Sequence, residues 1–252
     1  MYSSESGSLI NDLNQTYFQS KTMPTHLLNS IHHGLIVSCQ APIDSPMHNP
    51  VVISAIAQAS INQGAVGVRI DTPDHVKAVR SQCPTIPIIG LWKQQLPGYE
   101  VYITPQFHHA ETIASSGADI IAIDGTLRER PGGETVEGLI TRIHEELGKL
   151  VMADVDTIDS AINAAKAGAD IIGTTLYGYT NPTKHLSPPG FDLLVQMVEQ
   201  LEVPIICEGG IASPQMAQHA LKLGAYAVVV GTAITGIDLQ VKAYLEDMKD
   251  EG

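Results

Sequence analysis

A glycine–alanine pair occurs four times in this chain, each time between an amphipathic segment and a run of strand-forming residues. The pairs begin at Gly64, Gly117, Gly168 and Gly224. Their spacing is roughly 50 residues, the length of about two βα units. A glycine at the end of a helix supplies a left-handed cap, and the β-branched residues that follow favour a new strand. The pattern therefore predicts helices and strands that alternate regularly along the chain.

Other apolar runs lie between these repeats and bring the number of predicted strands to eight. Alternating βα units of this number predict an α/β chain folded as a single (β/α)8 TIM barrel, with a doubly wound sheet as the alternative. We expect residues 1–25 to form an N-terminal tail, with a short helix near residues 11–19, and residues 26–252 to form the barrel. The predicted strands are 34–40, 65–70, 87–93, 119–124, 150–154, 170–175, 203–208 and 225–231.

Charge and cysteine content exclude several classes of partner. The formal net charge is −13, which makes nucleic acids and anionic membranes poor partners. No apolar stretch reaches about 18 residues, so we expect no membrane span, and the N-terminus does not resemble a signal peptide. The three cysteines form no CxxC motif and lie in or beside apolar runs, which predicts buried, reduced thiols. We therefore expect a cytoplasmic protein.

Two glycine-containing turns follow the last two predicted strands. Residues 207–211 read CEGGI, and residues 230–234 read VGTAI. Glycines let backbone N–H groups gather around an anion, and TIM barrels commonly bind phosphate after their last two strands. We call these segments the glycine turns. They predict a phosphorylated ligand, although glycines are also common in ordinary strand-to-helix turns.

Charged side chains stand at the predicted strand ends, where barrel enzymes carry their functional residues. Lys93 closes an apolar strand, so we expect burial to make it a base or a nucleophile, unless it orients a carboxylate. Glu208 would face the same opening from a distant strand, or hydrogen-bond nearby backbone. Arg69 could neutralise an oxyanion, or pair with Asp71 or Asp154.

Further polar residues end the remaining strands. Asp124 and Asp154 could accept substrate hydroxyls or tie the barrel ends together. Gln40 fits a sugar hydroxyl or an amide, but it could also brace its loop. Thr175 ends the sixth strand. Ten histidines are present, yet none stands at a strand end and no HxH or HExxH motif occurs, so we expect neither a metal site nor a cofactor.

A series of short motifs gives the chain a family resemblance. They are LIVSCQ at 35–40, GVR at 67–69, PIIG at 87–90, Lys93, YITP at 102–105, DGT at 124–126, Arg128, RP at 130–131, MAD at 152–154, GTT at 173–175, GYT at 178–180, EG at 208–209 and VGTAIT at 230–235. Through these motifs the chain resembles the N-acylglucosamine-6-phosphate 2-epimerases, also called N-acetylmannosamine-6-phosphate 2-epimerases. The resemblance runs from about residue 34 to about residue 248.

The resemblance implies a cofactor-free homodimeric epimerase that acts on an open-chain amino-sugar phosphate. It implies that Lys93 is the catalytic lysine and Glu208 its partner carboxylate. Whether Lys93 makes both proton transfers or Glu208 serves one face stays open. We expect substrate contacts from Gln40, Arg69, Asp154 and Thr175, and a phosphate site at Gly209, Gly210, Gly231 and Thr232.

Three positions depart from the family pattern, each by loss of a basic residue. Gln94, Gly210 and Gly236 stand where relatives usually carry a positive charge. Other basic residues could move in from the loops after strands four and six, at Arg128, Arg130 or Lys184. Three rival functions follow: an epimerase for an unphosphorylated or differently substituted amino sugar, a Schiff-base lysine enzyme, and a non-catalytic phosphosugar-binding barrel.

The last predicted helix has an apolar face. It carries Val241, Tyr244, Leu245 and Met248. This face could form a dimer interface, or it could pack on the barrel.

Overall fold

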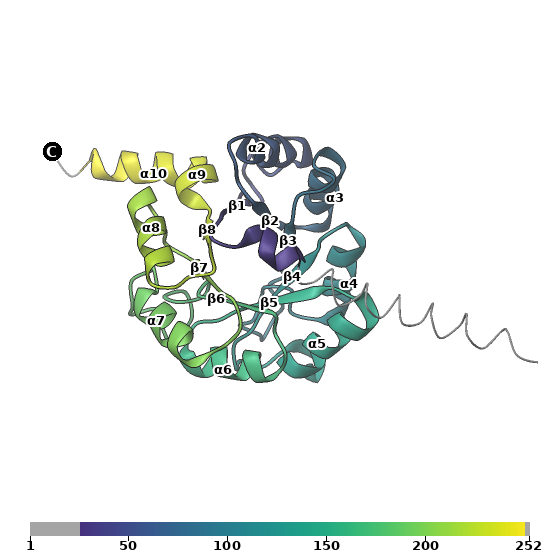
Figure 1. Cartoon of the computed structure of the whole chain (residues 1–252). Coiled ribbons are helices and arrows are strands. Elements are labelled where there is room, and N and C mark those ends of the chain that lie inside the picture. Colours follow the sequence, from purple (N-terminus) through teal and green to yellow (C-terminus); the bar gives the residue numbers. More distant parts are fainter. Residues whose placement is uncertain (1–25, 250–252) are drawn as a thin grey trace, which may run out of the picture.

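Eight parallel strands close into a barrel in the computed structural model, which describes residues 26–249. Each strand pairs with the next in sequence, and the first pairs with the last (Figure 1). The TIM barrel is confirmed, and the doubly wound sheet is wrong. The predicted tail and its helix near residues 11–19 lie outside the described residues. The strands are β1 Leu35–Cys39, β2 Gly67–Asp71, β3 Ile88–Leu91, β4 Ile120–Asp124, β5 Leu150–Asp154, β6 Ile171–Gly173, β7 Ile205–Glu208 and β8 Ala227–Val230.

Helices surround the strands and begin and end where the sequence indicates. Thr157 and Ser213 each accept a backbone N–H three residues on, which starts α6 and α8. The glycines of the four glycine–alanine pairs have φ between 95° and 109°, the conformation that a glycine cap requires. None of the helices within residues 26–249 has the length and apolar character to span a bilayer. The helices are α2 Pro50–Asn62, α3 Pro73–Gln82, α4 Phe107–Ser115, η1 Pro131–Gly133, α5 Val136–Arg142, η2 Ile143–Leu147, α6 Ile158–Lys166, α7 Phe191–Gln200, α8 Pro214–Lys222, α9 Thr232–Thr235 and α10 Ile237–Asp247.

Two apolar cores lie on either side of the strands. Successive side chains of a strand point to opposite faces. In β4, Ile120 and Ala122 belong to the core inside the barrel, whereas Ile121 and Ile123 belong to the core under the helices. Asp124, the last residue of β4, therefore takes an inward position. The same alternation fixes which polar strand ends face the barrel axis.

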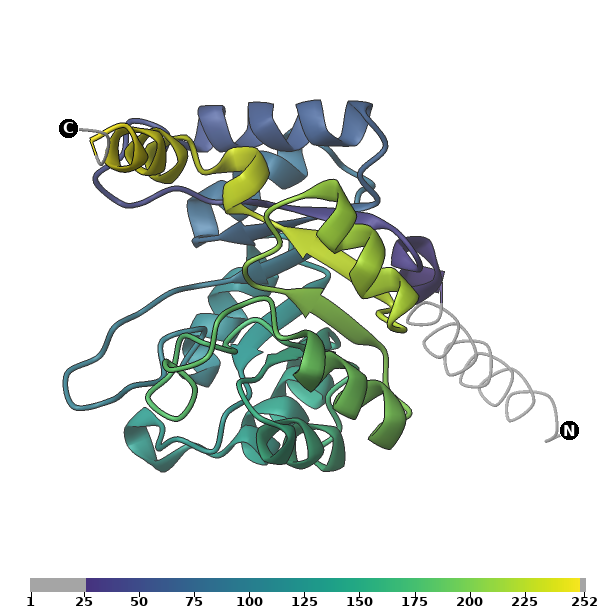
Figure 2. The ribbon, with the colours of Figure 1, turned by 90° about the vertical axis from the view of Figure 1, so that its left-hand side faces the viewer.

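The two ends of the barrel differ in character. Residues 26–31 form a helical turn at the N-terminal ends of the strands, and the fully buried Ile31 joins the inner core. This helix lies at the end away from the strand arrowheads (Figure 2). With that end closed, a ligand reaches the interior from the C-terminal ends of the strands.

The last helix, α10, does not pack its apolar face on the barrel. None of its residues is buried, and α10 extends away from the strands (Figure 1). The exposed fractions are 53% for Val241, 72% for Tyr244, 52% for Leu245 and 74% for Met248. Packing on the barrel, one of the two alternatives for this face, is therefore wrong.

Candidate active site

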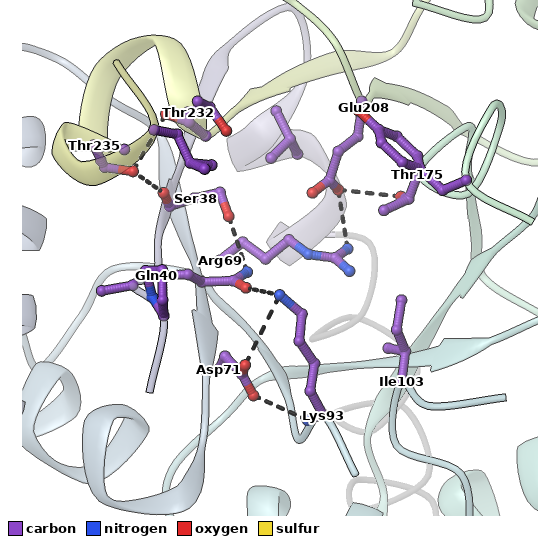
Figure 3. Close-up of a pocket in the computed structure, with 18 of the residues that line it drawn as sticks. Ser38, Gln40, Arg69, Asp71, Lys93, Ile103, Thr175, Glu208, Thr232 and Thr235 are labelled. Atoms are coloured by element: carbon purple, nitrogen blue, oxygen red, sulfur yellow. Dashed lines mark hydrogen bonds and ion pairs between the residues drawn. The ribbon is translucent and has the colours of Figure 1, made fainter. Parts of the chain in front are cut away.

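Strand alternation brings the polar strand ends together on the inner face of the barrel. The inner core includes Ile36, Ile89 and Ile206. Residues an even number of positions further along each strand face the same side. At the C-terminal ends of β1, β3 and β7 these residues are Gln40, Lys93 and Glu208. These side chains line a cavity of about 1060 Å³ at the C-terminal ends of the strands. Figure 3 shows them converging from different strands.

Lys93 lies just beyond β3, in the chain that leads to α4. Its ammonium donates to Gln40 Oε1 at 2.5 Å, and its backbone forms an antiparallel bridge with Ile103. The burial predicted for Lys93 is wrong, because its side chain is 45% exposed. The reason is that β3 ends at Leu91, so Lys93 rises above the apolar layer into the cavity mouth. Gln40 also donates to Ser38 Oγ at 2.9 Å, which fixes the amide between β1 and Lys93.

Asp71 is a site residue that the sequence reasoning missed, since we considered it only as a partner of Arg69. It ends β2, where Asp71 pairs with Leu91 of β3. One carboxylate oxygen accepts the Lys93 backbone N–H at 3.0 Å, and the other lies 3.9 Å from the Lys93 ammonium. Asp71 thus contacts both ends of the lysine. The sequence feature that could have identified Asp71 is its position at a strand end on the inward face.

A buried cluster of one arginine and two carboxylates lies beneath the cavity. Arg69 donates to the two oxygens of Asp154 at 3.1 and 2.6 Å, and it pairs with Glu208 at 3.0 Å. Arg69 is 1% exposed, and Asp154 is fully buried. The predicted alternative, an ion pair between Arg69 and Asp154, is what the structure contains. Asp154 lies behind the cavity wall, so it reaches a ligand only through Arg69 or Thr175.

Thr175 connects the two carboxylates of this cluster. Its hydroxyl lies 2.6 Å from Asp154 Oδ1 and 3.2 Å from Glu208 Oε2. Desolvation raises the pKa of Glu208 to about 7, with a further increase from Asp154, while Arg69 acts in the opposite direction. A carboxyl group with a pKa near neutrality can donate or accept a proton at physiological pH. Glu208 is therefore suited to acid–base chemistry.

The raised pKa of Glu208 predicts how stability depends on pH. Between about pH 4.5 and about pH 7, the folded chain keeps a proton that the unfolded chain has released. The free energy of unfolding therefore falls as the pH rises through this window. Between about pH 5 and about pH 8, the unsubstituted chain should lose about 2–3 kcal/mol of unfolding free energy through the ionisation of Glu208. We expect urea denaturation to show that this loss is absent in Glu208→Gln.

The control for this experiment is Glu202→Gln, an exposed glutamate just before the same strand. It should keep the pH dependence of the unsubstituted chain. An unchanged pH dependence in Glu208→Gln would contradict the assignment.

The glycine turns line the side of the cavity formed by β7 and β8. Gly209, Gly210, Gly231 and Thr232 all contribute to the wall. Within the described residues, the N–H groups of Gly209 and Gly210 donate no hydrogen bond to the protein. Thr235 Oγ donates to the Ser38 carbonyl at 2.8 Å, which holds the second turn against β1. Both turns thus present backbone to the cavity.

The basic residues of the loops do not reach this cavity, contrary to our expectation. Arg128 pairs with the buried Asp124 at 2.8 Å, and Arg130 donates to the Pro105 carbonyl. Lys184 donates to Asn181. None of the three lines the cavity. Buried Asp124 accounts for the position of Arg128, because a buried carboxylate needs a partner.

No group of three or more potential His, Cys, Asp or Glu metal ligands occurs within residues 26–249. The charged and amide side chains of the cavity are instead one lysine, one arginine, one histidine, three carboxylates and three amides. Such groups can move protons and bind hydroxyl or carbonyl oxygens.

Several known proteins are similar to this chain in sequence. Residues 53–250 match a family model described as "Putative N-acetylmannosamine-6-phosphate epimerase". A relative from Synechococcus elongatus with the name "Putative N-acetylmannosamine-6-phosphate 2-epimerase" is 60% identical over 219 residues, 86% of this chain and 94% of its own length. A relative of the same name from Thermosynechococcus vestitus is 59% identical over 224 residues, 89% of this chain and 97% of its own.

The chain belongs to the N-acetylmannosamine-6-phosphate 2-epimerase family. A solved structure of the epimerase from Clostridium perfringens superposes with a TM-score of 0.84 at 37% identity. The match covers 88% of this chain and 96% of the Clostridium chain. The family predicted from the sequence motifs is thereby confirmed.

Proposed function

We propose that this family member is a cofactor-independent isomerase that inverts C2 of N-acetylmannosamine 6-phosphate and yields N-acetylglucosamine 6-phosphate. The observation that carries the proposal is the placement of Lys93 and Glu208. They enter one cavity from β3 and β7, and Arg69 lies between them (Figure 3). Two proton-transfer groups on different sides of a cavity suit a reaction that removes a proton from one carbon and returns it on the other face.

The chemistry requires a base and stabilisation of negative charge. In the open-chain sugar, the C2 proton is acidic because the C1 carbonyl takes up the charge as an enediolate. Lys93, once its ammonium has released a proton to solvent, removes the C2 proton and becomes an ammonium again, and a proton then returns to the opposite face of C2. Lys93 as an ammonium, or Glu208 in its protonated form, can supply that proton.

The surrounding groups have supporting roles in this proposal. The charge of Arg69 keeps two carboxylates close to the reaction, and it favours an anionic enediolate in a poorly solvated site. Gln40, already bonded to Lys93, is placed to bind a sugar oxygen, and Thr175 to fix the orientation of Glu208. The glycine turns would bind the C6 end of the sugar through backbone N–H groups.

The test of the function is hydrogen exchange at C2. N-acetylmannosamine 6-phosphate incubated with the protein in D₂O should lose its C2 proton signal and form the second epimer with deuterium at C2. Starting from N-acetylglucosamine 6-phosphate should lead to the same equilibrium mixture, which serves as the control. If neither epimer acquires deuterium at C2, the proposal fails.

We infer two further properties from the family and the fold. The exposed apolar face of α10 supports the predicted homodimer. The three free and buried cysteines are those expected of a cytoplasmic protein. Sedimentation of the purified chain would test whether it forms a homodimer.

A further inference from the structure

Lysine and arginine side chains are absent from the side of the cavity formed by the glycine turns, within the described residues. Arg69, Lys93 and His48 are the basic residues that line it. Arg69 and Lys93 belong to β2 and the end of β3, and Figure 3 places Lys93 on the far side of Arg69 from Thr232. His48 lies in the loop after β1, with Nδ1 3.0 Å from the Ala41 carbonyl. The glycine turns themselves carry no cation.

The backbone keeps cations out of the two nearest positions. A side chain at Gly210 would place its Cβ 2.5 Å from Pro188 Cβ, and Gly210 has a φ of 70°. A side chain at Gly236 would place its Cβ 2.8 Å from the Thr232 Cα. Contacts this short with backbone atoms or a rigid proline ring are not tolerated without movement of the chain. The absence of a cation from these two positions is therefore a property of the packing.

The charged side chain nearest to the second turn along the chain is acidic. Asp238, in the first turn of α10, lines the cavity and accepts a hydrogen bond from Ser45 Oγ at 2.8 Å. A carboxylate beside the position of a phosphate disfavours the dianion. It has no such effect on a hydroxyl group. Uncharged N–H donors can also hydrogen-bond a hydroxyl oxygen, although each bond to an anionic phosphate oxygen is roughly twice as strong.

We infer that the C6 end of this cavity does not select for phosphate, and that the enzyme also epimerises the amino sugar with a free C6 hydroxyl. The inference rests on the proposed epimerase function and adds a second substrate class to it. The proton chemistry at C1 and C2 is the same for both sugars. Only the group held by the glycine turns differs.

The experiment compares N-acetylmannosamine with its 6-phosphate in the C2 exchange assay. We expect the two values of kcat/KM to differ by less than about thirtyfold, which is what the extra strength of two N–H bonds to an anionic oxygen supplies. A preference for the phosphate of about thirtyfold or more overturns the inference and leaves the proposed function standing. Absence of exchange with both sugars overturns the proposed function itself.

A pair of variants tests the charge argument separately. Asp238→Asn should raise kcat/KM for the 6-phosphate by a larger factor than for the free sugar. Asp247→Asn changes the net charge equally at the far end of α10, and it should alter neither value. An Asp238→Asn variant that affects both sugars alike, or neither, contradicts the placement of C6 beside this carboxylate.

Discussion

Replacing Lys93 with methionine should lower the rate of C2 proton exchange by about 10²–10⁴-fold, the usual contribution of a general base. Methionine keeps the length of the side chain and removes its amine. Because the Lys93 side chain is 45% exposed, its loss should cost less than about 1 kcal/mol of stability. The exchange assay in D₂O and a thermal melt on the same sample separate these two effects.

The matched control is Lys184→Met. Lys184 is exposed and outside the cavity, and its ammonium donates to Asn181. Exchange should continue at the normal rate in this variant. Near-normal exchange in Lys93→Met would remove Lys93 from the mechanism. Reduction with borohydride in the presence of substrate tests the Schiff-base alternative, because a covalent adduct on Lys93 forms only if the amine attacks the sugar carbonyl.

Replacing Arg69 with methionine should destabilise the fold by about 3–5 kcal/mol, because two carboxylates lose their counter-ion. Asp154 is fully buried, and the Glu208 side chain is only 12% exposed. Asp154 cannot recover the lost interaction from water without opening the barrel. Equilibrium denaturation in urea measures the change.

Arg142→Met provides the comparison for this variant. Arg142 forms an exposed ion pair with Glu146 one helical turn away, and such exposed pairs contribute little to stability. If Arg69→Met lowered the free energy of unfolding no more than Arg142→Met does, the buried cluster would not stabilise the fold as described.

The strands and their inward positions could be predicted because local patterns determine them. The glycine–alanine caps mark where each second strand begins, and the alternation of apolar residues separates the two cores. Asp154 ends β5 in both the prediction and the structure. The positions of side chains carried by strands could therefore be predicted without knowledge of distant contacts.

Features beyond the strand ends depend on contacts that the sequence does not display. Lys93 was expected to be buried, but its exposure follows from where β3 stops and from a bridge to Ile103. Arg128 was one of three candidates for a basic residue near the phosphate, but buried Asp124 holds it elsewhere. Asp71 was missed because its interaction with Lys93 depends on the register between β2 and β3. Long-range pairing decides each of these cases.

The contact between Gly210 and Pro188 also constrains the order in which substitutions can accumulate in this protein. An arginine at position 210 is blocked while proline occupies position 188, and the turn must also leave its positive φ. A lineage that gained a cation at position 210 would thus have to change the proline first, at a stage when that change alone brings no gain in binding. The gain therefore needs at least two steps, and laboratory evolution from single substitutions at position 210 should yield no improved variant.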